Sequence, residues 1–216
     1  MGNMINENVI MMLIGLLIGL ATYVLGQEYY SRRFDENMPK LKGYMVAQIA
    51  LPVIAAFCFD RFDYDCLYSA QLMVLMSLLI LAGKIDKHKR IIPNIIVITL
   101  LAVRILALGV LSIMDRQGFA EELANCLCGF TVMLVTFILV RLVYKNSIGM
   151  GDIKLMVVVG LYLGIMRSMY VLLLASVLAV IVSLTSMARK RMGLKDSLSF
   201  GPNIAIGGVV VLILGI

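Results

Sequence analysis

Two aspartates stand beside apolar segments of this chain. Asp86 lies in a charged stretch that follows one such segment and precedes Pro93. Asp152 follows Gly149 and Gly151 and opens another apolar run. Two carboxyl groups held close together do not easily both ionise, so they share a proton and act as an acid and a base. Such a pair activates water against a peptide carbonyl and protonates the leaving amine, which is the chemistry of aspartic proteolysis.

Each aspartate also has a purely structural interpretation. Gly149 and Gly151 could end a loop, with Asp152 as the N-cap of the helix that follows. Asp86 could be a solvated loop acid whose charge is neutralised by basic neighbours, which are Lys87, Lys89 and Arg90. The sequence alone does not show that the two carboxyl groups meet.

The composition is that of an integral membrane protein. Of the 216 residues, 62% are hydrophobic and 15% are charged, whereas soluble domains are roughly half apolar and a quarter charged. A membrane-spanning helix needs about 20 mostly apolar residues, and its backbone satisfies its own hydrogen bonds. We therefore expect an all-α fold, a polytopic bundle of transmembrane helices.

The apolar runs and the breaks between them predict about eight spans in a single integral membrane domain, residues 1–216. Pro52 falls inside a predicted span, where neighbouring helices can satisfy the freed carbonyl. The predicted spans are 8–26, 44–59, 66–83, 94–113, 122–143, 153–166, 168–187 and 200–216.

The positions of the basic residues orient this bundle. Most of the 19 Lys and Arg fall in alternate breaks, near residues 32–42, 84–90, 141–154 and 189–195. Short loops rich in Lys and Arg stay in the cytoplasm, so both termini are predicted outside, and Asp86 and Asp152 at the same cytoplasmic depth. The topology explains the net charge of +6, so we expect membrane lipids as partners and no nucleic acid.

The remaining polar and sulfur-containing residues do not indicate a metal site. Cys58, Cys66, Cys126 and Cys128 form no C-x-x-C pair, and we expect apolar packing, no disulfide, no metal and no cofactor. Arg104 falls mid-span, where a charge faces the bundle interior and has a partner. His88, the only histidine, is expected in a polar loop, exposed to solvent or lipid rather than acting as a base.

Three motifs resemble those of one family. Gly149-Met150-Gly151-Asp152-Ile153-Lys154-Leu155 is similar to the G-x-G-D-x-K-L signature of the type IV prepilin peptidases, membrane aspartic proteases of the GxGD class. Asp86, followed after six residues by Pro93-Asn94, resembles their first catalytic aspartate. Phe200-Gly201-Pro202 resembles the opening of their last helix. The resemblance covers residues 70–216, and the motifs follow the family's order.

The resemblance implies a multi-pass protein of the cell membrane, an aspartic endopeptidase that removes the basic leader of prepilin-like substrates at the cytoplasmic face. Asp86 and Asp152 would be catalytic. Lys154 would orient the loop or a carboxylate, or would be only a basic anchor at the membrane surface. The other residues expected to shape the loops or bind substrate are Gly149, Gly151, Phe200, Gly201 and Pro202.

Two other functions stay open at this point. Many members of the family are bifunctional and also methylate the new N-terminus, with a zinc-binding domain after the first span. Here that stretch, residues 27–43, is short and has no cysteine, which favours a peptidase-only short form. A small ion- or proton-coupled transporter would use the acids and Arg104 as a relay near the membrane midplane. The sequence does not indicate the oligomeric state.

Overall fold

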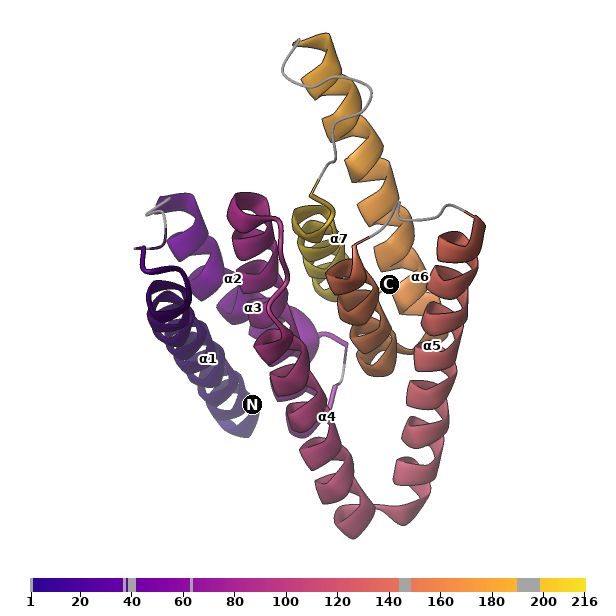
Figure 1. The fold of residues 1–216 in the computed structure, drawn as a ribbon. Coiled ribbons are helices and arrows are strands. Elements are labelled where there is room, and N and C mark those ends of the chain that lie inside the picture. The colour runs from indigo at the N-terminus through magenta and orange to yellow at the C-terminus, as the bar shows by residue number, and fades with distance from the viewer. Residues whose placement is uncertain (1, 37, 39–41, 63, 144–148, 190–198) are drawn as a thin grey trace.

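Seven helices make up the described part of the chain, and together they form an all-α bundle (Figure 1). The structure is a computed structural model that describes residues 2–36, 38, 42–62, 64–143, 149–189 and 199–216. The helices are α1 (Gly2–Phe34), α2 (Lys42–Asp60), α3 (Cys66–Lys89), α4 (Asn94–Met114), α5 (Arg116–Val143), α6 (Met150–Ala188) and α7 (Gly201–Leu214).

The helices have the length and composition of membrane spans. Five of them, α1, α3, α4, α5 and α6, are long and apolar enough to cross a membrane, and the apolar helices Gly43–Phe59 and Gly201–Leu214 are shorter. Because a chain that crosses lipid must satisfy its own backbone hydrogen bonds, such helices are what the composition requires. The prediction of a polytopic transmembrane helix bundle is confirmed, and the protein is a multi-pass membrane protein.

Helix α6 accounts for the difference between seven helices and about eight predicted spans. It covers both 153–166 and 168–187, but it is broken at Gly164, whose φ is 69° and ψ is −167°. A glycine has no Cβ and adopts positive φ at little cost. The two arms of α6 run in different directions from this break (Figure 1), so the segment divides at Gly164, inside the predicted span 153–166 and not between the two predicted spans.

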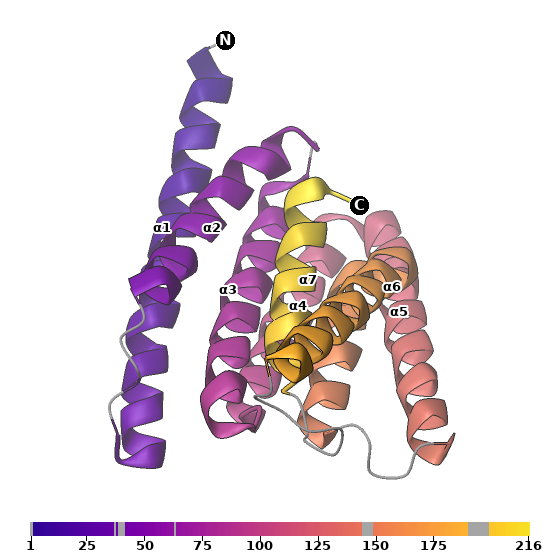
Figure 2. The same cartoon turned by 90° about the horizontal axis from the view of Figure 1, so that it is seen from above.

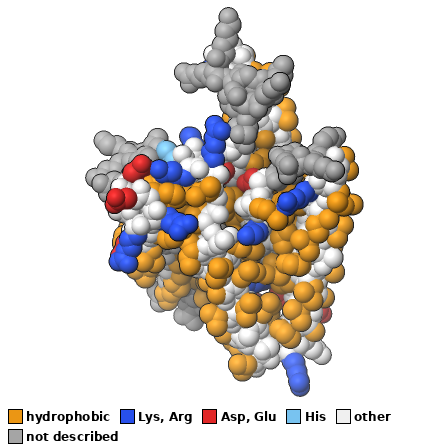
Figure 3. Space-filling model, viewed as in Figure 1, with side chains coloured by type: hydrophobic (Ala, Val, Ile, Leu, Met, Phe, Trp, Pro, Cys, Tyr) orange, Lys and Arg blue, Asp and Glu red, His pale blue; other side chains and the backbone are white. Residues whose placement is uncertain are grey.

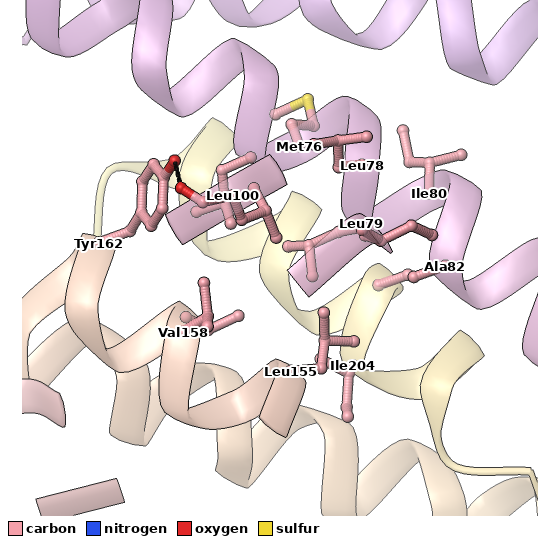
Figure 4. Packing of buried hydrophobic residues seen from close by; sticks show 14 of the residues in the cluster. Met76, Leu78, Leu79, Ile80, Ala82, Leu100, Leu155, Val158, Tyr162 and Ile204 are labelled. Atoms are coloured by element: carbon pink, nitrogen blue, oxygen red, sulfur yellow. Dashed lines mark hydrogen bonds between the residues drawn. The ribbon is translucent and has the colours of Figure 1, made fainter. Parts of the chain in front are cut away.

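Helix α3 is the centre of the bundle. Most of its residues between Ser69 and Asp86 are buried, and it packs against α1, α2, α4, α6 and α7 (Figure 2). Leu79 of α3, Leu155 of α6 and Ile204 of α7 belong to one buried apolar cluster (Figure 4). The helix continues to Lys89, six residues beyond the predicted end, so Asp86 lies on a helix and not in a loop.

Arg104 of α4 is buried in the bundle and is 1% exposed. It forms an ion pair with Glu122 of α5, and its Nη1 donates to Oε1 of Gln71 of α3 at 2.6 Å. Its Nε donates to the carbonyl of Leu161, in the turn of α6 before the break at Gly164, at 3.2 Å. The prediction that this arginine faces the interior and has a partner is confirmed, and its guanidinium joins four helices.

Basic side chains gather at one end of the bundle, which we call the basic end. Here α1 and α3 finish, and Lys89 of α3 lies over the rings of Tyr30 and Phe34 of α1. Lys and Arg side chains lie across the upper part of the face in Figure 3, above a largely hydrophobic surface. Of the basic residues behind the orientation argument, Lys40, Lys145, Lys190, Arg191 and Lys195 lie outside the described residues.

Candidate active site

Asp86 lies at the basic end, in the last turn of α3. The C-cap of the helix is Arg90, which has left-handed backbone angles (φ 54°), and the Arg90 N–H donates to the carbonyl of Asp86 at 2.8 Å. The Asp86 residue is only 5% exposed. Lys89 forms its ion pair with Glu36 instead. The interpretation of Asp86 as a solvated loop acid is therefore wrong.

The carboxyl group of Asp86 is bound by the start of α7. The Ser199 hydroxyl donates to Oδ2 at 2.5 Å, and the backbone N–H of Gly201 donates to the same oxygen at 2.9 Å. A Cβ on residue 201 would lie 2.6 Å from this Oδ2, so the contact requires glycine. The F-G-P motif pointed to Gly201, but Ser199 was missed, and its only signal in the sequence is its position directly before that motif.

Asp152 lies in the first turn of α6. The N-cap of this helix is Gly149, and no side chain of the described residues caps it, so the interpretation of Asp152 as the N-cap is wrong. Helix N-termini favour negative charge, and the carboxyl group lies close to Gly149, where a Cβ would be 3.1 Å from Oδ2. The other oxygen, Oδ1, is buried and has no hydrogen-bond partner among the described residues.

Two contacts hold the start of α6 against the segment that joins α3 to α4. A Cβ on Gly151 would lie 2.9 Å from the Cβ of Ile92, so the glycine permits close packing. Lys154 Nζ donates to Oδ1 of Asn94, the first residue of α4, at 3.1 Å. Lys154, which is exposed, therefore contacts the start of α4. Its two interpretations, positioning of the loop or of a carboxylate and a basic anchor, both stay predictions.

Asp86 and Asp152 line one cavity of about 300 Å³. The end of α3 and the start of α6 both line this cavity, and each contributes one carboxyl group. Of the predicted residues, Gly149, Gly151 and Lys154 also line the cavity, whereas Gly201 touches the Asp86 carboxyl group from α7. The other lining residues are Arg90, Ile91, Ile92, Asn94 and Met150.

The other residues singled out from the sequence lie outside this cavity. Phe200 is the N-cap of α7 and packs against the buried apolar cluster. Pro202 lines a separate apolar groove. His88 is exposed, with its ring Nδ1 2.9 Å from the carbonyl oxygen of Lys84 in its own helix. The expectation that His88 is an exposed residue is confirmed, although it lies on a helix rather than in a loop.

The arrangement can perform acid and base chemistry with two carboxyl groups. One is buried and accepts two hydrogen bonds on a single oxygen, and the other has a buried oxygen without a partner in the described part of the chain. Within the same described residues, no group of three or more His, Cys, Asp or Glu side chains is placed to hold a metal ion.

Comparison with protein families identifies the group to which the chain belongs. A model of the type IV leader peptidase family matches residues 73–184. This chain belongs to that family. The match is just over half of the 216 residues and includes both Asp86 and Asp152. The family predicted from the three motifs is confirmed.

Curated relatives carry one printed name, prepilin leader peptidase/N-methyltransferase. The protein of Pseudomonas aeruginosa is 24% identical over 177 residues, 81% of this chain and 59% of the relative. The protein of Bacillus subtilis is 27% identical over 143 residues, 66% of this chain and 55% of the relative. A protein of Burkholderia pseudomallei is 40% identical over 70 residues, 32% of this chain and 23% of the relative.

The chain thus spans less than two thirds of the length of these relatives. No solved structure matches it significantly.

Proposed function

We propose that the protein is a membrane aspartic endopeptidase that removes the basic leader of type IV prepilin-like proteins at the cytoplasmic face. One observation carries the proposal. Asp86 of α3 and Asp152 of α6 line the same cavity, in a chain of the type IV leader peptidase family. Two carboxyl groups in one partly dry site supply the acid and the base that peptide hydrolysis needs.

The different surroundings of the two carboxyl groups suggest their roles. Hydrogen bonds from Ser199 and Gly201 hold one carboxyl oxygen of Asp86 in place. In the proposed dyad, Asp86 takes a proton from the attacking water. Asp152, whose buried Oδ1 has no hydrogen-bond partner in the described part of the chain, carries the shared proton and supplies it to the leaving amine. The scissile carbonyl would lie in the cavity between them.

The neighbouring residues would position these groups. Gly149 leaves room for the carboxyl group of Asp152, and Gly151 lets the start of α6 lie close to Ile92. Lys154 links this helix to Asn94. Gly201 fixes the carboxyl group of Asp86 from α7. We assign these four residues positioning roles, while the two aspartates are the catalytic residues.

The basic end supports the cytoplasmic side as the location of the site. Loops rich in Lys and Arg are retained in the cytoplasm, and Asp86 and Asp152 lie at that end of the bundle. Acids at one end of the bundle do not favour an ion relay at the midplane. The substrate's apolar helix would lie against the bundle, with its leader and the scissile bond at this end.

Leader removal by the purified protein tests the proposal. Proteoliposomes containing the chain are incubated with a prepilin-like protein whose basic leader ends in glycine, and the product is identified by mass spectrometry. We expect release of the intact leader and a product that begins directly after the glycine. A substrate with valine in place of that glycine is the matched control. Uncleaved substrate in the presence of folded protein would contradict the proposal.

The same product also tests a second candidate function. The relatives' printed name includes N-methyltransferase, which favours a bifunctional enzyme. If S-adenosylmethionine is added, methyl transfer would increase the mass of the new N-terminal peptide by one methyl group. A product of unmodified mass would leave the peptidase as the function of this chain.

A further inference from the structure

An apolar groove separate from the carboxylate cavity lies between α2, α3 and α7. Its volume is about 510 Å³, within the range of small-molecule binding sites. No residue lines both the groove and the carboxylate cavity. The groove is lined by Gly43, Tyr44, Ala47, Leu51, Ile80, Gly83, Pro202, Ala205, Ile206, Val209 and Val210.

The outer edges of this groove lie on the apolar surface of the bundle. Ile206 of α7, which lines the groove, is 51% exposed, and Val46 of α2, beside the lining residue Ala47, is 58% exposed. In a membrane-spanning bundle, an apolar surface of this kind faces the hydrocarbon region. The groove is therefore accessible to molecules dissolved in the bilayer.

Two lysines lie at the groove's basic end. Lys84 is 4% exposed, and its Nζ is 5.7 Å from the centre of the Tyr44 ring and 5.9 Å from that of Tyr23. Lys87 is exposed and lies over the same Tyr44 ring at 5.8 Å. Tyr44 itself lines the groove. Tyr44 therefore connects the two lysines to the groove, because its ring contacts both cations and also lines the groove.

Lys84 is a buried cation that has no acidic partner among the described residues. The ion pairs among the described residues join Arg32 to Glu28, Lys89 to Glu36 and Arg104 to Glu122, and none includes Lys84 or Lys87. Aromatic rings stabilise a cation only partly. A buried charge in a membrane segment is costly and normally has a partner, so the position fits an anionic group from outside the chain.

We propose that this groove binds an anionic phospholipid, with an acyl chain between α2 and α7 and the phosphate beside Lys84 and Lys87. The groove offers an apolar channel open to the bilayer and two cations at the depth of one membrane surface. Basic pockets between membrane helices on the cytoplasmic side are a known form of lipid recognition. This site is independent of the proposed peptidase activity.

The charge of the lysines favours a lipid over the substrate as the occupant. The proposed substrate carries a basic leader at the same membrane surface, and two lysines at the mouth of the groove would repel it. An anionic headgroup would be attracted by the same pair. The substrate helix is therefore an alternative occupant that the experiment must distinguish.

Photolabelling in nanodiscs tests the proposal. The full chain is reconstituted in phosphatidylcholine that contains phosphatidylglycerol with a photoreactive acyl chain, and labelled peptides are mapped by mass spectrometry. We expect labelling in residues 43–51 and 202–210. Lys84→Gln should reduce this labelling about fivefold, the effect of one basic residue near an anionic surface, and Lys84→Arg should retain it.

Two further variants control the experiment. Arg33→Gln removes an exposed charge at the end of α1 and should leave the labelling unchanged. Ala47→Phe places a ring in the groove and should reduce labelling without changing any charge. If Lys84→Gln does not fold, Ala47→Phe and the comparison of the two lipids on the wild-type protein still decide the question.

Three results would overturn the proposal. The first is equal labelling of the groove by a photoreactive phosphatidylcholine, and the second is undiminished labelling in folded Lys84→Gln. The third is displacement of the label by an equimolar prepilin, which would make the groove a substrate site. If the wild-type protein is labelled as expected but does not remove a prepilin leader, only the proposed function is contradicted.

Discussion

Gly201 and Asp86 are in direct contact between α7 and α3. The backbone N–H of Gly201 donates to Oδ2 of Asp86 at 2.9 Å, and a Cβ at residue 201 would lie 2.6 Å from that same oxygen. Gly201 thus binds the carboxyl group of Asp86, and any side chain at residue 201 would displace that group. The first turn of α7 thereby sets the position of an acid that lies 115 residues earlier in the chain.

Gly201→Ala tests this contact. The added methyl group would push the carboxyl group of Asp86 from its place, and a misplacement of about 1 Å costs about a hundredfold in rate. We expect kcat for leader removal to fall by this amount in a protein that still folds. Gly109→Ala on α4 is the matched control, because no atom of the described residues that could clash lies within 4 Å of its Cβ position. Equal activity of the two variants would show that the contact does not position Asp86.

Ser199→Ala tests the second donor to Asp86. Loss of a hydrogen bond to a charged group costs about 1.5 to 3 kcal/mol, so we expect kcat to fall about ten- to a hundredfold with KM little changed. Ser176→Ala is the control, since that exposed hydroxyl donates only to the carbonyl of Leu172 in its own helix. A change confined to KM would instead indicate a contact with substrate.

A double-mutant cycle distinguishes the two interpretations of Lys154. If its bond to Asn94 positions α6, then Lys154→Ala and Asn94→Ala should each lower activity, and their effects should not add. We expect a coupling of about 1 kcal/mol, roughly a fivefold effect on kcat/KM, as for a typical hydrogen bond. Additive effects would mean that Lys154 acts only as a basic anchor at the membrane surface.

The ion pair of Arg104 and Glu122 makes a prediction about stability. Arg104 is buried, so removal of Glu122 leaves its charge without its acidic partner, and breaking a buried ion pair costs about 3 to 5 kcal/mol. We therefore expect Glu122→Gln to lower the free energy of unfolding in detergent by this amount. Arg116→Gln, at an exposed position, should change it by less than about 0.5 kcal/mol. Similar values for both variants would contradict a structural role for this ion pair.

The periodicity and charges of the sequence were sufficient to predict the all-α membrane bundle. They placed breaks near Pro93 and ahead of Asp152 because prolines, glycines and charges interrupt apolar runs there. The prediction ended α3 too early, because the charges of Lys84, Lys87 and Lys89 are typical of a loop. These lysines remain helical and lie over Tyr23, Tyr30, Phe34 and Tyr44 of α1 and α2, and such contacts between helices are invisible in hydropathy.

The candidate site was predictable in its residue types but not in its contacts. Asp86 and Asp152 stood out because acids at the edges of apolar segments are rare. Ser199 did not stand out, since a serine before an apolar helix is common, and the donor from Gly201 is a backbone group. Glu122 stood at the start of the predicted span 122–143, but α5 begins at Arg116, so Glu122 lies within the helix, where it pairs with Arg104.

Leader removal by Asp86→Asn and Asp152→Asn tests the central claim most directly. Each asparagine keeps the size of the side chain but can neither take nor supply the proton, and loss of general acid or base catalysis costs about a hundredfold or more. With purified variants whose unfolding midpoints match the wild type, we predict that both lose cleavage of the prepilin leader. Cleavage at the wild-type rate by either variant would contradict the two-aspartate site.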